Sequence, residues 1–302
     1  MDAETFRRSL RDKGPFSLKT SSKIRREGDV MHIARTNVVT MAGTTPIYEA
    51  VKLMAEKGFR RIPIADPGTK TLEGIVTATD IIDYLGGGEK FNIIQQRFKG
   101  NIYAAINEPV RLIMTKKVFS VKTTADISEV VGIMKDKNVG GVPVVDEENR
   151  VKAILTERDI AYLFVDKLSG VKVAQIMTKN VATATPKTTI LRAEKMMISR
   201  GFRRLPIVSN GEVLGIITAM DIIRFFGSGD VFKHLKQGTI KQVLSMPATR
   251  IASKDVKTIE AEADIGQAAK IMYERNLGAL PVVKGKELVG IVTERDFFKI
   301  IE

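Results

Sequence analysis

Threonine and aspartate side chains recur at one fixed spacing in this chain, and they are the residues best placed to do chemistry. The four Thr-x-x-Asp pairs are Thr77 with Asp80, Thr156 with Asp159, Thr218 with Asp221, and Thr293 with Asp296. A carboxylate can accept hydrogen bonds from two neighbouring hydroxyl groups, such as those of a ribose. The same spacing is also what the cap at the start of a helix requires. Duplication would copy a cap as faithfully as a binding site, so both interpretations stay open.

Adjacent arginines precede two of these pairs. The two segments are Gly58-Phe59-Arg60-Arg61-Ile62-Pro63 and Gly201-Phe202-Arg203-Arg204-Leu205-Pro206. Guanidinium groups bind phosphate through paired N–H···O contacts, and two of them side by side repel unless an acidic group lies near. Gly140-Gly141 and Gly278-Ala279 stand at the same place before the other two pairs. The arginines therefore mark the expected phosphate positions, although a surface pair without function is the alternative.

The composition argues against an enzyme. The chain has no cysteine, which excludes disulfides, thiolate metal sites and cysteine nucleophiles. His32 and His234 are its only histidines and lie in different repeats. No nucleophile–base arrangement can be found among the remaining residues. We therefore expect no catalytic residues and no metal site.

A net charge of +13 suggests anionic partners such as phosphorylated small molecules or nucleic acid. Residues 1–35 hold nine Lys and Arg against five Asp and Glu, so the rest of the excess is spread over the repeats. This favours many small anion sites over one large patch. Residues 1–33 are expected to be a flexible extension, with a nucleic-acid-binding arm as the alternative. No signal sequence or membrane span is expected, which predicts a cytoplasmic protein.

Each Thr-x-x-Asp pair lies in a unit with a constant order of predicted elements. In the first unit these are a short strand at 37–41, a helix, strands at 61–65 and 72–77, and a second helix from Thr79-Asp80 to the glycines at 86–88. Thr45 as N-cap and Pro46 at the first helical position open the first helix, and Gly58 ends it. A β-α-β-β-α unit of about 55 residues cannot bury its own sheet face, so the copies must pair.

The sequence predicts an α/β (α+β) protein with four domains after the extension. Their predicted ranges are 34–88, 110–166, 173–227 and 248–302. Units one and three share Thr-Ala-x-Asp, whereas units two and four share Thr-Glu-Arg-Asp. A duplicated pair explains this alternation, so residues 34–166 and 173–302 are expected to form two similar halves.

The repeated Gly-Phe-Arg-Arg-(Ile/Leu)-Pro and Thr-x-x-Asp motifs resemble cystathionine-β-synthase (CBS) domains, whose tandem pairs are called Bateman modules. Four copies with glycine-rich connectors are similar to the archaeal four-CBS proteins and to the nucleotide-binding γ subunit of AMP-activated protein kinase. The resemblance implies two modules packed as a disk with pseudo-two-fold symmetry. It also implies that the four Thr-x-x-Asp pairs bind ribose.

Further site residues follow from the resemblance. Ile75 and Ile216 are expected to line the adenine. The phosphate ligands are expected to be Arg60, Arg61, Arg203 and Arg204, with Arg158 and Arg295 behind them. The implied ligands are AMP, ADP or ATP, with Mg²⁺ accompanying ATP, and no cofactor is required.

The implied function is that of an energy sensor that transmits nucleotide occupancy to a protein partner, and the disks could pair into a homodimer. The first alternative is a nucleic-acid-binding protein that uses the basic extension and surface. The second is S-adenosylmethionine, which other CBS proteins bind. The double arginines argue against this ligand because it has no phosphate.

Overall fold

The computed structural model describes residues 30–235 and 240–301. They form two compact units, each built from two non-consecutive repeats. The odd-repeat unit, residues 39–118 and 182–256, holds repeats one and three. The even-repeat unit holds repeats two and four, in residues 30–38, 119–181 and 257–301. Repeats that are alike in sequence therefore share a unit.

The odd-repeat unit contains two copies of the predicted element order. The elements of repeat one are α3 (Ile47–Lys57), β1 (Arg61–Ala65), β2 (Leu72–Thr77), α4 (Ala78–Ile82) and the π-helical turn η1 (Asp83–Gly87), and they are followed in this unit by α5 (Phe91–Phe98), α6 (Ile102–Ile106) and η2 (Val110–Leu112). The elements of repeat three are α10 (Ile190–Arg200), β6 (Arg204–Ser209), β7 (Glu212–Thr218) and α11 (Ala219–Gly227), and they are followed by η4 (Asp230–His234), α12 (Lys241–Leu244) and η5 (Ala248–Arg250).

The even-repeat unit repeats the order with shorter helices. Its first elements are α2 (Val30–Ile33), β3 (Val121–Lys122), α7 (Ile127–Asp136), β4 (Gly141–Val145), β5 (Val151–Thr156), α8 (Glu157–Ala161), η3 (Tyr162–Phe164) and α9 (Val173–Ile176). Repeat four follows with β8 (Ile259–Glu260), α13 (Ile265–Glu274), β9 (Ala279–Lys284), β10 (Glu287–Thr293) and η6 (Glu294–Ile300).

An antiparallel hairpin forms the centre of every repeat. Strands β1 and β2 have the bounds predicted for them, and their register places Arg61 opposite Thr77. The predicted leading strand is short and parallel to the hairpin. It consists of a single bridge at Met41 in repeat one and at Ala184 in repeat three, and of the two-residue strands β3 and β8 in the other repeats.

The start of α3 differs from the prediction. Pro46, not Thr45, is the residue that caps this helix, and it makes no side-chain cap hydrogen bond. The Ile47 N–H instead donates to the Glu108 carbonyl at 2.8 Å, from a segment far along the chain. A long-range main-chain partner thus satisfies a helix-start donor that the local sequence assigned to a threonine. The end of the helix is as predicted, with Gly58 in the left-handed region at φ 68°.

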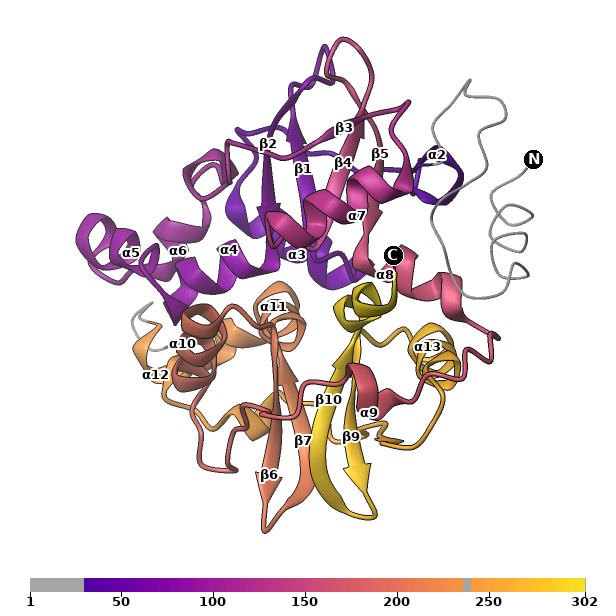
Figure 1. Ribbon diagram of the computed structural model, residues 1–302. Helices are drawn as coiled ribbons and strands as arrows, with labels where there is room; N and C mark the ends of the chain where they lie inside the picture. Colours follow the sequence, from indigo (N-terminus) through magenta and orange to yellow (C-terminus); the bar gives the residue numbers. More distant parts are fainter. Residues whose placement is uncertain (1–29, 236–239, 302) are drawn as a thin grey trace. The chain divides into compact units, whose positions relative to one another are not determined.

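Helices of the two odd repeats pack against one another. α3 lies against α11 (Figure 1), and α10 lies against η1. The glycines at 86–88 lie at the second of these contacts. A Cβ on Gly86 would come within 2.6 Å of Glu194 Oε2, so a side chain at this position would force the Glu194 carboxylate to move. The helical segment ends at these glycines, as predicted, and the same glycines form a packing surface against α10.

The even-repeat unit has its own core. α8 lies against η6 and α13 lies against η3, and the buried aromatic rings of Phe164 and Phe297 meet at 5.3 Å between centroids. Two residues after the ends of the helices α7 and α13 lie Asn138 and Asn276, whose φ angles are 52° and 53°. Asparagine tolerates this left-handed conformation, so it takes the place of the glycines in the odd repeats. No helix in the described residues is long and apolar enough to cross a membrane.

Candidate functional site

Each Thr-x-x-Asp pair forms a capping box at the start of a helix. The threonine N–H donates to Oδ2 of the aspartate at 2.7–2.9 Å, and the threonine hydroxyl donates to the same oxygen at 2.6–2.7 Å. The interpretation as a helix cap is therefore correct for all four repeats. The two contacts use the accepting capacity of Oδ2, which leaves Oδ1 to other partners.

A cationic side chain holds Oδ1 of every one of these aspartates. The pairs are Lys90 Nζ with Asp80, Arg35 Nε with Asp159 at 2.9 Å, Arg224 Nη2 with Asp221, and Lys299 Nζ with Asp296 at 2.7 Å. The aspartate side chains are only 3–11% exposed, whereas the cations are 29–52% exposed. A nearly buried carboxylate is thus neutralised in each repeat by a long side chain that reaches it from the surface.

None of these four cations was predicted as a partner of its aspartate. Arg224 and Lys299 follow their aspartates by three residues, which is the spacing of neighbours on one helix face, so a search for basic residues at that position could have found them. Lys90 is ten residues from Asp80, and Arg35 is 124 residues from Asp159. Neither of these two contacts has a local signal.

The arginine pairs lie beside the capping boxes of their own repeats. Arg61 is opposite Thr77 in the β1–β2 register, and the Arg60 carbonyl accepts the Ala78 N–H at 2.9 Å. Repeat three repeats this arrangement, with Arg204 opposite Thr218 and the Arg203 carbonyl 2.9 Å from the Ala219 nitrogen. All four arginines are partly exposed. The fold therefore brings the predicted phosphate residues to the predicted ribose residues.

Arg158 and Arg295 are placed differently from the other arginines. Arg158 Nε is 2.7 Å from Glu294 Oε1, and Arg295 Nη1 is 3.1 Å from Glu157 Oε1. Both glutamate side chains are only 2% exposed. Burial disfavours the charge of Arg158, but the Glu294 carboxylate outweighs it and raises the pKa of Arg158. The two Thr-Glu-Arg-Asp motifs thus exchange ion pairs and join repeat two to repeat four.

The predicted adenine residues lie in the second strand of each odd hairpin. Ile75 is buried in β2 and forms an isolated bridge with Thr115, while Ile216 is half-buried in β7 and forms a bridge with Ser253. Each isoleucine precedes its site threonine by two residues, so both point to the same side of the strand. The residues predicted to contact the base and the ribose are therefore adjacent in each odd repeat.

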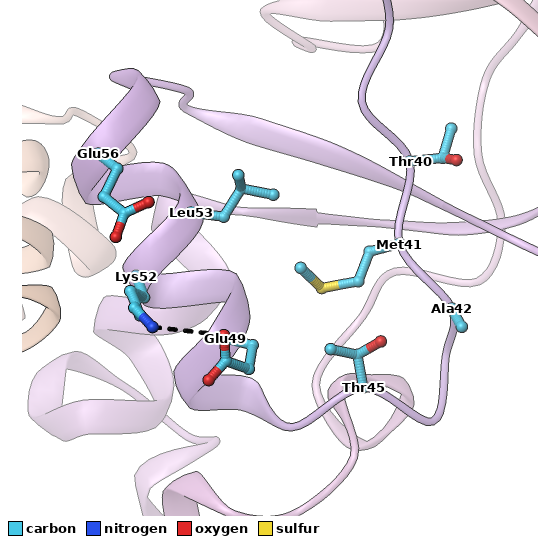
Figure 2. A pocket seen from close by; sticks show the side chains of 8 residues that line it. All are labelled: Thr40, Met41, Ala42, Thr45, Glu49, Lys52, Leu53 and Glu56. Carbon is cyan, nitrogen blue, oxygen red and sulfur yellow. Dashed lines mark ion pairs between the residues drawn. The ribbon is translucent and has the colours of Figure 1, made fainter.

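Repeat one also has a surface pocket with a volume of about 460 Å³, which Figure 2 shows. Its lining residues are Thr40, Met41, Ala42, Thr45, Glu49, Lys52, Leu53 and Glu56. Lys52 Nζ lies 3.9 Å from Glu49 Oε2 in an exposed ion pair. The lining includes none of the predicted ribose, phosphate or adenine residues, so this pocket is separate from the capping boxes. Within residues 30–235 and 240–301, no group of three or more His, Cys, Asp or Glu is arranged to hold a metal ion.

Comparison with known proteins places the chain in a family. The model of the CBS domain matches residues 29–87, 110–166, 173–228 and 248–302. Protein MJ1225 of Methanocaldococcus jannaschii is 39% identical over 273 residues, which cover 89% of this chain and 98% of that protein. A 33.4 kDa protein of Thermofilum pendens is 32% identical over 259 residues, with 86% of each chain covered.

Solved structures agree with these relatives. The crystal structure of MJ1225, a candidate archaeal homologue of γ-AMPK, has a TM-score of 0.84 at 38% identity and covers 89% of this chain and 98% of that one. A protein of Pyrococcus horikoshii shares the fold, with a TM-score of 0.57 at 20% identity over 89% of this chain and 97% of that one. The chain therefore belongs to the family of CBS-domain proteins and contains four CBS domains.

Proposed function

We propose that the chain is a regulatory protein that binds adenine nucleotides, AMP, ADP or ATP, at its Thr-x-x-Asp sites. One observation supports the proposal most directly. In every repeat the helix cap uses only Oδ2 of the aspartate, while Oδ1 faces a cation that reaches it from the surface. A cap alone does not need this second oxygen, but a ribose hydroxyl does.

The neighbouring residues support a nucleotide in the odd repeats. Arg60 and Arg61 lie beside the first capping box, and Arg203 and Arg204 lie beside the third. Arginines on residues next to a ribose acceptor suit the phosphates of a nucleotide, because guanidinium groups bind phosphate through paired N–H···O contacts. Because Arg158 and Arg295 are committed to buried glutamates, we assign them to the packing of the even repeats instead.

An exchange of the partner that contacts Oδ1 gives a mechanism by which the protein could sense the nucleotide. When ribose hydroxyls take Oδ1, the displaced cation can turn to the phosphates of the same ligand. AMP, ADP and ATP bring different negative charge, so they neutralise the cations to different extents. A ligand shifts the state of the protein only by its differential affinity for two conformations. We propose that this difference is transmitted to a protein partner, which would explain a regulatory chain without catalytic residues.

Ligand identity can be tested on the purified protein. We expect saturable binding of AMP and ATP in calorimetric titrations, and an adenine absorption spectrum with a nucleotide mass for any ligand that co-purifies. S-adenosylmethionine is expected to bind more weakly because it offers the arginines no phosphate. Tight binding of S-adenosylmethionine without binding of AMP or ATP would contradict the proposal and favour that ligand.

The alternative function is nucleic-acid binding through the basic N-terminal extension, most of which lies outside the described residues. Deletion of residues 1–29 separates the two functions. All four capping boxes lie in the remaining chain, so we expect AMP binding to change by less than about twofold, within the scatter of surface changes. Binding to nucleic acid, if present, should fall with deletion and steeply with salt. Loss of AMP binding on deletion would contradict sites built by the repeats alone.

A further inference from the structure

A short extended segment pairs with the second hairpin strand in every repeat. It meets the isoleucine two residues before the site threonine. The bridges join Arg35 to Ile154, Thr115 to Ile75, Thr178 to Ile291, and Ser253 to Ile216. Two main-chain hydrogen bonds of 2.8–3.0 Å form each bridge. The backbone is therefore equivalent at the four places, and only the side chains distinguish them.

Repeat two departs from the pattern of these side chains. Three bridges have a hydroxyl residue followed by lysine, in Thr115-Lys116, Thr178-Lys179 and Ser253-Lys254. At the fourth the order is reversed, because Arg35 precedes Thr36. Successive residues of an extended chain point to opposite sides. Moving the basic residue by one position therefore turns it toward the side occupied by Asp159.

The Arg35 side chain crosses the site of repeat two. Its main chain pairs with Ile154, and its Nε lies 2.9 Å from Asp159 Oδ1. The equivalent residues of the odd repeats, Ile75 with Asp80 and Ile216 with Asp221, are the ones predicted to contact the base and the ribose. A threonine or serine at the bridge is too short to reach the aspartate. In the other repeats the cation reaches the aspartate from its own helix or from the segment after it.

Asp159 also has no cation three residues later on its own helix, and Arg158 beside it is paired with Glu294. The residue three positions later is Tyr162, whose ring lies 5.9 Å from the Arg158 guanidinium. Arg224 and Lys299 occupy this position in repeats three and four. With its side chain 3% exposed, Asp159 needs a counter-charge, and Arg35 supplies it. Repeat two lacks the arginine pair as well, since Gly140-Gly141 stand in its place.

We propose that Arg35 closes the ribose position of repeat two to nucleotide. The side chain fills the space that a nucleoside would take, and its ion pair with Asp159 replaces the ribose contact. This inference rests on the proposed function, because it treats Ile154 and Asp159 as the base and ribose ends of a site. Arg35 is thus a residue that determines which repeats take part in nucleotide binding.

An exchange of two neighbouring residues tests the inference without changing the net charge. Arg35→Thr combined with Thr36→Lys gives repeat two the hydroxyl–lysine order of the other three. In calorimetric titration with AMP, the double variant is expected to bind one more equivalent per chain than the wild type. Thr36→Lys alone, which keeps Arg35, is the matched control and should leave the stoichiometry unchanged. Adding Asp159→Asn to the double variant should remove the extra site.

A single substitution in the wild type gives an independent measurement if the exchange destabilises the protein. Arg35→Ser places a short hydroxyl residue at the bridge, as Ser253 does in repeat three, and should add one AMP equivalent per chain. No gain in a folded Arg35→Ser variant or in a folded exchange variant would overturn the role of Arg35. If the wild type binds no nucleotide at all, the proposed function itself fails. AMP binding that is lost in Asp80→Asn but unaffected by the exchange rejects only the Arg35 inference.

Discussion

At the scale of single residues, the two oxygens of each site aspartate have separate partners. In repeat one, Oδ2 of Asp80 accepts from the nitrogen and hydroxyl of Thr77, and Oδ1 faces Lys90. The cap and the cation site are therefore parts of one side chain. This explains why the sequence pattern was compatible both with helix capping and with ribose binding.

Glu194 is a second carboxyl group with an unusual environment. It is fully buried in α10, and neither side-chain oxygen has a hydrogen-bond partner among the described residues. Burial raises the pKa of Glu194 well above its ordinary value. The folded state therefore holds a proton that the unfolded state releases above a pKa of about 4.3. Its contribution to stability is retained below that pH and declines as the pH rises toward the folded pKa.

Replacing Glu194 with methionine should remove this pH dependence. The variant keeps a long, flexible side chain but has no acidic group to desolvate. We expect stabilisation of about 1–3 kcal/mol near pH 8, the cost of a buried unsatisfied polar group. Near pH 4 the gain should be smaller because the unfolded carboxyl is then largely protonated. Melting temperatures across this pH range would check the prediction, and an equal shift at both ends would contradict it.

At the scale of secondary-structure elements, the helix starts of the even repeats hold those repeats together. Arg158 at the start of α8 pairs with Glu294 of η6, and Arg295 of η6 pairs with Glu157 of α8. The odd repeats have Ala78 and Ala219 where the even repeats have glutamate, and both alanines are buried. An even helix start facing an odd one would leave a buried charge without a partner. The two motif types thus favour the pairing of like repeats.

Removing one partner of these ion pairs tests whether they hold the even repeats together. We expect Glu294→Ala to lower the free energy of unfolding by about 3–5 kcal/mol, because it leaves the Arg158 charge buried without its partner. Adding Arg158→Met should recover part of the loss. Urea denaturation of the two single variants and the double variant gives the coupling. Lys172→Ala, which breaks an exposed pair with Glu262, is the control and should change the midpoint little. Additive losses in the double variant would contradict a direct ion pair.

Several elements were predictable because their signals are local. The bounds of β1 and β2 follow from alternating apolar residues and the Asp66-Pro67-Gly68 turn, whose aspartate accepts hydrogen bonds from Gly68 and Thr69. The predicted N-cap of α3 was wrong because the first N–H of the helix bonds to the carbonyl of Glu108, which is distant in sequence. The packing role of Gly86 was missed because α10 is in another repeat.

At the scale of the whole molecule, the repeats that are most similar in sequence are also the repeats that pack together in one unit. Repeats one and three form one unit, and repeats two and four form the other. The predicted halves, 34–166 and 173–302, describe the duplication along the chain and stay a prediction as structural modules. Sequence could identify the family and the capping residues from local repetition. It could not identify Arg35 as the partner of Asp159, since that contact depends on the fold bringing distant segments together.

The central claim is that Oδ1 of the site aspartates accepts a nucleotide ribose. Its most direct test is calorimetric titration of AMP and ATP into the wild type and into the double variant Asp80→Asn with Asp221→Asn. Asparagine keeps an oxygen for the cap but replaces the second acceptor with an amide. Asp80→Ala with Asp221→Ala is the companion that also loses the cap, at a cost of about 1 kcal/mol each.

We expect the asparagine variant to keep its melting temperature more closely than the alanine variant. In both variants, binding at the odd repeats should weaken roughly tenfold to a hundredfold, as expected when a charged hydrogen bond worth about 1.5–3 kcal/mol is lost. Unchanged AMP and ATP titrations in the folded asparagine variant would contradict the account and would leave the Thr-x-x-Asp pairs as helix caps alone.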